Sequence, residues 1–371
     1  MTQRSARPDI NAFAAQDRLG TPDLAVQLWL VAVAVLVFAM IVVGGATRLT
    51  DSGLSITEWQ PLLGVIPPLS EADWAEAFAK YKQIPQYELV NHGMSLAEFQ
   101  YIYWWEWAHR FLGRFIGIVF ALPLIYFWAK GRLRPVLVPK LWGLLALGAL
   151  QGFFGWYMVQ SGLVERIDVS HYRLALHLTT ALVILGLLVW LILDVAAFAD
   201  ADRIRLQTVT GSQQGLAYLL AVLLFVQLIV GAFVAGTNAG LTYNTWPLMD
   251  GRLIPNGLAS LTPWYMNLLE NITTIQFTHR VLAYLLLVLA AGHAIGIALS
   301  ADDERIITSS RLLVVALVLQ AGLGIWTLLA AGEAGRIPIW LGLLHQAGAA
   351  IVVVTCVWHL HRMVGARANA R

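Results

Sequence analysis

The sequence predicts an all-α integral membrane protein, with eight transmembrane helices that form two tandem four-helix bundles. Three observations lead to this prediction. Hydrophobic residues make up 58% of the 371 residues, and charged residues only 12%. Eight apolar segments are long enough to cross a bilayer, which takes about 20 helical residues. The first four segments resemble the last four, which predicts two units related by a pseudo-twofold axis along the membrane normal.

The eight predicted spans follow one another through mostly short connections. Their extents are Leu24–Ala46, Trp105–Ala129, Val138–Gln160, Leu174–Phe198, Gly215–Ala235, Ile272–Leu299, Leu312–Ala331 and Ile339–Met363. The chain then divides into a tail (1–23), a first bundle (24–202), a linker (203–214), a second bundle (215–363) and a second tail (364–371).

The distribution of positive charge predicts the orientation of the spans. Fourteen of the 24 lysine and arginine residues belong to the termini, the even-numbered loops and the span ends next to them, and seven belong to the odd-numbered loops. Positive charge is retained on the cytoplasmic side, so both termini are expected there. Residues 1–23 lack an apolar stretch and contain three aspartates, which favours a bacterial inner-membrane protein over a cleaved or imported one. The net charge of +2 gives no indication of nucleic-acid binding.

The first outward loop, 47–104, is the longest connection. Ser70–Asp73 and Ser95–Glu98 have the spacing of capping boxes and predict two helix starts. In the first helix Trp74, Phe78 and Tyr81 share one face, which lies either on the membrane surface or against the protein itself. Tyr101, Tyr103, Trp104 and Trp105 are typical of an aromatic belt where a span enters the membrane, or of a ligand pocket.

The internal repeat places four histidines at matching positions. Segment 43–54 resembles segment 230–241, and Leu150-Gln151 recurs as Leu319-Gln320. In the same register His109-Arg110 recurs as His279-Arg280, and His177 recurs as His345. All four histidines lie one to three turns from the outer start of a span. Ionisable residues inside a bilayer are costly, so they indicate function.

Two bis-imidazole haem sites explain this pattern best. Haem iron accepts axial imidazole, and its apolar ring suits the interior of a helical bundle. His109 with His177 would hold one haem, and His279 with His345 the other. Hydrogen bonding between helices is the alternative for any single histidine. A zinc site is a weaker explanation, because each half offers two histidines and no third ligand.

Charged residues near the histidines extend this prediction. Arg48, Arg110 and Arg280 are candidate contacts for haem propionates, whereas Arg114 is expected to extend to the headgroups. Glu106 lies one helical turn before His109, and the equivalent residue before His279 is Gln276. A carboxylate there can accept a proton during an oxidation. Its alternatives are a place among headgroups or an ion pair with Arg110.

The other histidines and the single cysteine are expected to play structural roles. His92 and His171 are predicted to face solvent in outward loops, and His293 to form a polar contact between helices. His359 and His361 approach the cytoplasmic end and are predicted to be interfacial. Cys356 is the only cysteine, which excludes an intrachain disulfide and fits simple core packing.

At these residues the chain resembles the haem A synthase family, over nearly all of the sequence after residue 24. The resemblance rests on Gly44–Ser55, on Ile56–Trp59, and on Glu98-Phe99 together with Trp105–Arg110. It is closest to the alphaproteobacterial and mitochondrial branch, because the loop cysteine pair of the Bacillus-like branch is absent.

The resemblance implies oxidation of a methyl group of haem O to a formyl group, which gives haem A for terminal oxidases. It implies that Glu106, His109 and His177 serve the substrate haem, and that His279 and His345 ligate a resident haem b. Haem O synthase and oxidase-assembly proteins are the implied partners, and a quinone or redox protein the electron acceptor. A diheme b-type electron carrier is the alternative; four histidines near one face count against it. A haem transporter is third.

Overall fold

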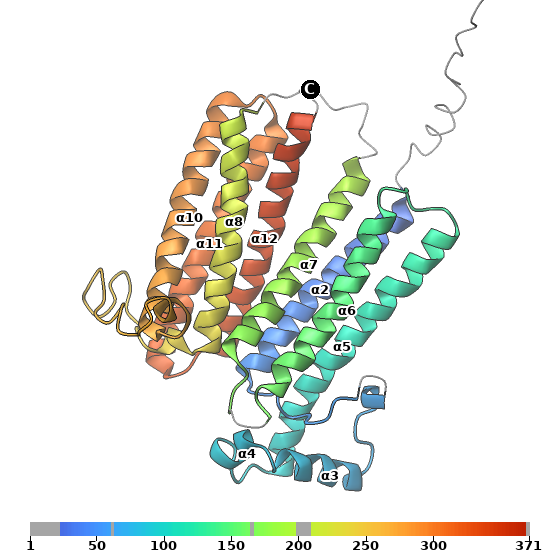
Figure 1. Ribbon diagram of the computed structural model, residues 1–371, viewed down its shortest axis with the longest axis vertical. Helices are drawn as coiled ribbons and strands as arrows, with labels where there is room; N and C mark the ends of the chain where they lie inside the picture. Colours follow the sequence, from blue (N-terminus) through green and yellow to red (C-terminus); the bar gives the residue numbers. More distant parts are fainter. Residues whose placement is uncertain (1–22, 61–62, 164–166, 198–208, 369–371) are drawn as a thin grey trace, which may run out of the picture.

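The computed structural model describes residues 23–60, 63–163, 167–197 and 209–368. Within these residues eight helices are long and apolar enough to cross a membrane, and no extended strand occurs. Figure 1 shows them as two groups of four, side by side. The prediction of an all-α, eight-span membrane protein is confirmed.

The spanning helices have the following bounds. In the first half they are α2 (Leu24–Leu49), α5 (Leu96–Ala129), α6 (Val138–Gln160) and α7 (His171–Ala197). In the second half they are α8 (Gly211–Gly236), α10 (Ile272–Ser300), α11 (Glu304–Ala334) and α12 (Ile339–Ala368). Because α8 begins at Gly211, the last residues of the predicted linker are helical. The rest of that linker, up to residue 208, lies outside the described residues, as does the tail 1–22.

Three helices begin several residues earlier than hydropathy predicts. The side chains of Ser95, Thr210 and Asp303 accept backbone hydrogen bonds at the starts of α5, α8 and α11. A capped first turn is stable outside the hydrocarbon, so it can be polar. A window that measures hydropathy detects only the apolar part of the helix and therefore sets its start too late.

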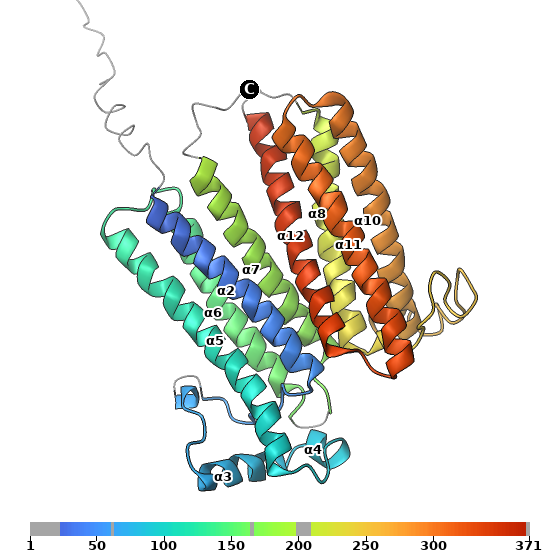
Figure 2. The same cartoon turned by 180° about the vertical axis from the view of Figure 1, so that it is seen from behind.

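The two halves meet along α2, α7, α8 and α12. Helix α7 contacts α8, and the equivalent helix of the second half, α12, contacts α2 (Figures 1 and 2). These two contacts are equivalent under the internal repeat, which is consistent with the predicted twofold relation between the halves. Among the polar contacts that cross between the halves, the Gln346 amide of α12 donates to the Ile41 carbonyl of α2 (2.6 Å). The same amide lies against Gly45, where a Cβ would come 2.6 Å from its oxygen.

The long loop of the first half is an ordered layer at one end of the bundle (Figure 1). It contains η2 (Leu63–Val65), α3 (Glu71–Tyr81) and α4 (Pro85–Leu89), and both predicted capping boxes are present. On α3, Phe78 stacks on Phe99 of α5 (4.9 Å between centroids), and Trp74 contacts Tyr103. The apolar face of α3 therefore packs on the protein itself. We call this end of the molecule the loop end.

The second half has a different connection at the loop end. Its segment between α8 and α10 contains only two short helices, η4 (Ala239–Leu241) and α9 (Met266–Leu269). The rest of that segment is irregular and projects sideways from the bundle (Figure 2).

Candidate haem sites

The four predicted ligand histidines lie on four different helices, each in the part nearer the loop end. His109 is on α5, His177 on α7, His279 on α10 and His345 on α12. Helices α7, α10 and α12 begin at the loop end, and each histidine follows the helix start by six or seven residues. This corresponds to about 10 Å along each axis, so these three side chains lie at a similar depth.

Each of these rings packs on a glycine of a neighbouring helix. A Cβ on Gly44 would lie 3.1 Å from His109, and one on Gly155 would lie 3.0 Å from His177. In the second half a Cβ on Gly231 would lie 3.1 Å from His279, and one on Gly324 would lie 2.9 Å from His345. Contacts of 3.0–3.1 Å are tighter than nine in ten real Cβ contacts, and real Cβ atoms essentially never show the 2.9 Å contact at Gly324, so the four glycines leave the room that the rings occupy.

A glutamine amide holds one histidine in each half. Gln151 lies 3.1 Å from Nδ1 of His177 and donates to the carbonyl of the same residue (2.9 Å). Gln320 makes both contacts with His345, at 3.1 Å and 2.8 Å. The Oε1 atoms of both glutamines are buried without a partner. Because a carbonyl oxygen can only accept, the amide nitrogen of each glutamine must point towards its histidine, and it positions the ring from the Nδ1 side.

The spacing of the first pair fits a metal between the rings. The centroids of His109 and His177 are 6.4 Å apart. Two metal–nitrogen bonds of about 2 Å each, plus the distance from each nitrogen to its ring centre, require about 6 Å. Among the described residues no group of three or more metal-ligating side chains occurs. The residues therefore fit axial ligation of haem, whose porphyrin supplies the other ligands, better than a bare zinc ion.

Glu106 is buried beside His109 and is fully hydrogen-bonded. Its Oε2 accepts from Ser55 Oγ and from the Ile56 amide, each at 2.7 Å. Its Oε1 accepts from Nη2 and Nε of Arg110, at 2.6 Å and 3.0 Å. Of the two predicted alternatives, the ion pair with Arg110 is present, and a position among headgroups is wrong because the side chain is only 3% exposed.

Arg110 and Arg280 make the same backbone contacts in their two halves. Arg110 donates to the carbonyls of Ile56 and Glu58, at 2.8 Å and 3.0 Å. Arg280 donates to the carbonyls of Tyr243 and Thr245, at 2.8 Å and 2.9 Å. Both arginines therefore fix the segment that follows the first helix of their half, in the same repeat register.

The second half differs at the position of the carboxylate. Gln276 donates to the Tyr243 carbonyl (3.0 Å), and its Oε1 is buried without a partner. Each half thus holds the loop after its first helix through a pair of residues one helical turn apart. Only the first half places a negative charge there.

The other two arginines singled out from the sequence, Arg48 and Arg114, contact loop residues. Arg48 pairs with Asp51 (3.2 Å) and donates to Asn238 of the second half (3.3 Å), while its Nε is buried without a partner. Burial raises the pKa of the Asp51 carboxyl, and Arg48 opposes this shift. Arg114 donates to the Gln60 carbonyl (2.9 Å), so the loop holds this guanidinium.

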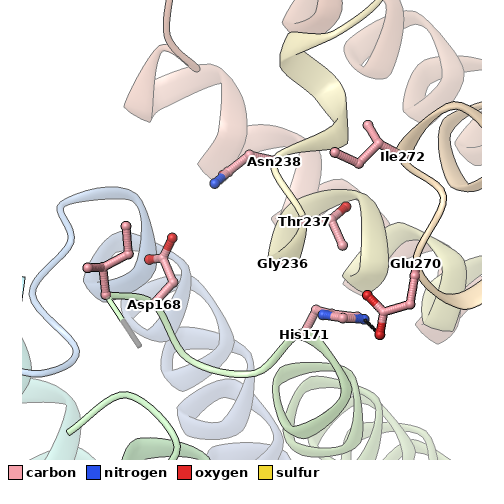
Figure 3. Close-up of a pocket in the computed structure, with 8 residues that line it drawn as sticks. Asp168, His171, Gly236, Thr237, Asn238, Glu270 and Ile272 are labelled. Atoms are coloured by element: carbon pink, nitrogen blue, oxygen red, sulfur yellow. Dashed lines mark ion pairs between the residues drawn. The ribbon is translucent and has the colours of Figure 1, made fainter. Parts of the chain in front are cut away.

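A polar cavity of about 500 Å³ opens at the loop end between the two halves. Figure 3 shows Asp168 and His171 of the first half facing Thr237, Asn238 and Glu270 of the second. The prediction that His171 faces solvent is wrong. It is 5% exposed and lies 3.1 Å from the Leu269 carbonyl, because it begins α7 and packs on the second half. His92 is exposed, as predicted.

The histidines at the other end form two groups. His293 and His359 are buried and hydrogen-bonded to each other (2.8 Å). This confirms the predicted role of His293 but corrects that of His359, which faces the core of the second half rather than an interface. His361 lies partly exposed at 3.0 Å from Asp194 of α7. Cys356 is buried, in agreement with core packing.

Several residues of these sites were not identified from the sequence. The glycines under the rings and the amides of Gln151 and Gln320 all repeat between the halves, and this register was the available signal. Ser55 carried no such signal, because its bond to Glu106 joins residues 51 positions apart.

The fold and the four histidines define a class: multi-pass helical membrane proteins with a pair of histidines suited to haem in each of two four-helix units. The family described as "Cytochrome oxidase assembly protein" matches residues 27–357. A heme A synthase of Parvibaculum lavamentivorans is 50% identical over 96% of this chain and 98% of its own length. Those of Chelativorans sp. and Brucella ovis are 50% and 49% identical, over 97% and 92% of this chain and 96% and 93% of their own. The chain belongs to the heme A synthase family.

Proposed function

We propose that this protein is an oxidoreductase that converts haem O to haem A, by oxidising one ring methyl group to a formyl group. The match to heme A synthases along almost the whole chain supports this function. The structural observation that carries it is the asymmetry between the halves. Two matching histidine sites are present, and only one has a buried carboxylate beside its ligand. One substrate site and one cofactor site are the simplest reading of such a pair.

The first half is proposed as the substrate site, with His109 and His177 as ligands of the haem O iron. The second half is proposed to hold a haem b between His279 and His345. When bound, that haem supplies a one-electron redox centre in the membrane. The protein fixes the rings through the glycines and amides described above, and the apolar helices exclude water from their surroundings.

Glu106 is proposed to accept protons as the methyl group is oxidised. If water supplies the oxygen, conversion of –CH₃ to –CHO releases four protons and four electrons. In the structure four hydrogen-bond donors surround Glu106, so a proton can be taken up only if one donor leaves. Arg110 and Ser55 are the candidates, since each has another acceptor nearby: the Ile56 carbonyl for Arg110 and the Ile102 carbonyl for Ser55.

Among the arginines proposed to bind haem propionates, Arg48 has the strongest support, because its buried Nε has no partner. Arg110 and Arg280 already bind two carbonyls each. They would contact a propionate only through their remaining N–H groups.

The electron acceptor is proposed to be a quinone or a redox protein, and haem O synthase and oxidase-assembly proteins are the proposed partners. The protein is proposed to lie in a bacterial inner membrane with both termini in the cytoplasm. Reporter fusions after residue 371 test this orientation. A reporter that works only in the cytoplasm should be active. A carboxyl terminus found in the periplasm would contradict the proposed orientation.

The proposed reaction is tested by expressing the protein in a host that makes haem O but lacks haem A. Haems extracted from the membranes are then separated by chromatography. Haem A or its hydroxylated precursor should appear only with the protein. Unchanged haem O beside fully assembled protein would contradict the proposal.

A further inference from the structure

The connection between α8 and α10 presents apolar side chains at the side of the second bundle. Figures 1 and 2 show this segment beside α10, whereas the layer of α3 and α4 lies beyond the end of the first bundle. Its most exposed large side chains are Leu253 (79%), Trp264 (74%) and Ile254 (68%). Large apolar groups that are exposed together mark a surface that contacts lipid or another protein.

We propose that this segment lies in the membrane leaflet at the loop end, with Leu253, Ile254 and Trp264 in contact with lipid. This role is separate from the proposed reaction and does not depend on it. It gives a membrane-embedded position to a connection that hydropathy leaves outside the spans.

The segment is bonded to the face of α10 that points to lipid. Nε1 of Trp246 donates to the hydroxyl of Tyr284 (3.0 Å). Tyr284 is 42% exposed, and its neighbours on the same helix face, Val281 and Val288, are 43% and 69% exposed. In a spanning helix such an exposed apolar face lies against acyl chains. The segment therefore adjoins a surface that lipid already covers.

These contacts lie well inside the length of α10. The helix begins at Ile272, so Arg280, which binds the Tyr243 carbonyl, follows its start by eight residues. Tyr284 follows by twelve residues. These positions are about 12 Å and 18 Å along the helix axis.

The length of α10 places these contacts near the boundary between headgroups and acyl chains. Its 29 residues extend over about 44 Å, whereas the hydrocarbon core is about 30 Å thick. If both ends share the excess, the bonds to Arg280 and Tyr284 lie about 5–11 Å inside the hydrocarbon boundary. Apolar groups of interfacial segments reach a similar depth.

Hydrogen bonds within the segment make this depth possible. Irregular backbone is tolerated there only where the protein satisfies its polar groups. Thr245 Oγ1 donates to the Leu248 carbonyl (2.8 Å) and accepts from the Asp250 amide (3.0 Å). Met249 and Arg252 exchange two backbone bonds, of 2.9 Å and 3.2 Å. The carbonyls at the start of the segment are bound by α10, as described above.

The composition of the segment also fits a membrane surface. Between residues 242 and 269 the charged side chains are Asp250 and Arg252 alone. Both are exposed, so they can extend to the headgroups. Trp264 and Tyr265 are exposed as well, and these residue types are enriched where protein meets the membrane surface.

Lipid contact at this segment would act on the candidate site of the second half. Gln276 and Arg280, which lie on either side of His279 in the sequence, both bind the start of the segment. Seating the segment in the leaflet would therefore hold the surroundings of His279 at a fixed depth.

Spin labels test where the segment lies. Cys356, the single cysteine, is replaced by alanine, and Leu253→Cys is labelled with a nitroxide. The full chain is reconstituted in bilayers of phosphatidylcholine and phosphatidylglycerol. Accessibility is measured with oxygen, which concentrates in lipid, and with a water-soluble nickel chelate. Val288→Cys on α10 is the reference for lipid. Leu89→Cys on α4 is the matched reference for water, because Leu89 is 74% exposed.

The ratio of oxygen to nickel accessibility at Leu253→Cys should match that at Val288→Cys and exceed that at Leu89→Cys several-fold. A ratio like that of Leu89→Cys would place the segment in water and overturn the proposal. Protection from both reagents would show a contact with a second copy or another protein, and would overturn it equally. Ile254→Cys repeats the measurement if Leu253→Cys does not assemble.

A second measurement uses the natural chain. A phospholipid with a diazirine in its acyl chain is added to the same bilayers and activated by light. Peptides that contain Leu253 and Ile254 should be labelled, as should those from α10, and the peptide that contains Leu89 should not. Unlabelled Leu253 peptides beside labelled α10 would contradict lipid contact. Neither measurement involves haem, so both are independent of the proposed reaction.

Discussion

The two halves use the same parts to hold two histidines and differ in what surrounds them. Both have rings packed on glycines, a glutamine on one ring, and an arginine that fixes the loop after the first helix of its half. The first half adds a buried carboxylate and an ordered layer of α3 and α4. The second adds the His293–His359 pair. The shared features are those proposed to hold a haem in each half, and the unshared ones separate the half proposed for chemistry from the half proposed for electron transfer.

The largest expected effect comes from removing one proposed ligand in each half. His345→Leu should abolish nearly all binding at the site it shares with His279, because leucine offers no ligand. His177→Leu should leave that site intact and abolish binding of haem O. Visible spectra and haem content of the purified variants check this, with His92→Leu as an exposed control. Equal losses from both variants would erase the distinction between the halves.

The next effect isolates the carboxylate. Glu106→Gln keeps the shape of the side chain and removes its charge. Since general-base help is worth about 10²–10⁴-fold in rate, haem A formation should fall by that factor while haem O stays bound. Chromatography of extracted haems measures both. Glu58→Gln changes an exposed carboxylate of the same loop and should have little effect. Near-normal haem A from Glu106→Gln would leave Glu106 a purely structural role.

A smaller effect is expected from filling the space under a ring. Gly324→Ala should displace His345, and overpacking of about 1–3 kcal/mol corresponds to roughly tenfold or more in haem b affinity. Gly322→Ala is the matched control, because a Cβ there meets nothing within 4 Å. Gly155→Ala and Gly152→Ala form the same pair for haem O. Loss of affinity in a control variant would mean that helix packing, not the ring, is responsible.

The smallest expected effect is on thermal stability, and it comes from removing the cap of the first helix in each half. Asp23 caps α2 and pairs with Arg132 (2.5 Å), whereas Thr210 caps α8 without an ion pair. Each change to alanine should cost about 1 kcal/mol from the cap. The hydrogen bond from Arg132 is the main cause of a lowered pKa of Asp23. The ionised carboxylate therefore stabilises the fold above about pH 4, and this stability is lost as the pH falls through the lowered pKa.

Thermal unfolding from pH 7 down to pH 3 checks this comparison. The natural chain and Thr210→Ala should lose stability in parallel as the pH falls. Asp23→Ala should lose less over that range, because it has no carboxylate to protonate. Identical pH profiles for all three would show that the ion pair contributes nothing.

Hydropathy and the internal repeat were sufficient to predict the spans and the placement of the four histidines on four different spanning helices. Both signals are local or periodic: an apolar run marks a helix in lipid, and a residue that recurs in register marks a shared role. The starts of α5, α8 and α11 were set too late because their capped first turns are polar. His171 and His359 were misplaced because their burial depends on which helices meet in space. Two of the four donors on Glu106 belong to Arg110, the ion pair that the sequence offered as an alternative. The other two, Ser55 Oγ and the Ile56 amide, come from a distant loop that spacing could not reveal.

The glycine pair at the end of α2 has a consequence for the order in which the two sites fill. Gly44 lies under His109, while Gly45 lies under Gln346, the neighbour of His345. Helix α2 therefore packs against residues of both candidate sites, so any movement of α2 when one site is filled would reach the other. Thermodynamic linkage then requires that each haem change the affinity of the other by the same factor. Loading of the cofactor half would thus set how tightly the substrate is held, and release of product would be sensed on the far side of α2.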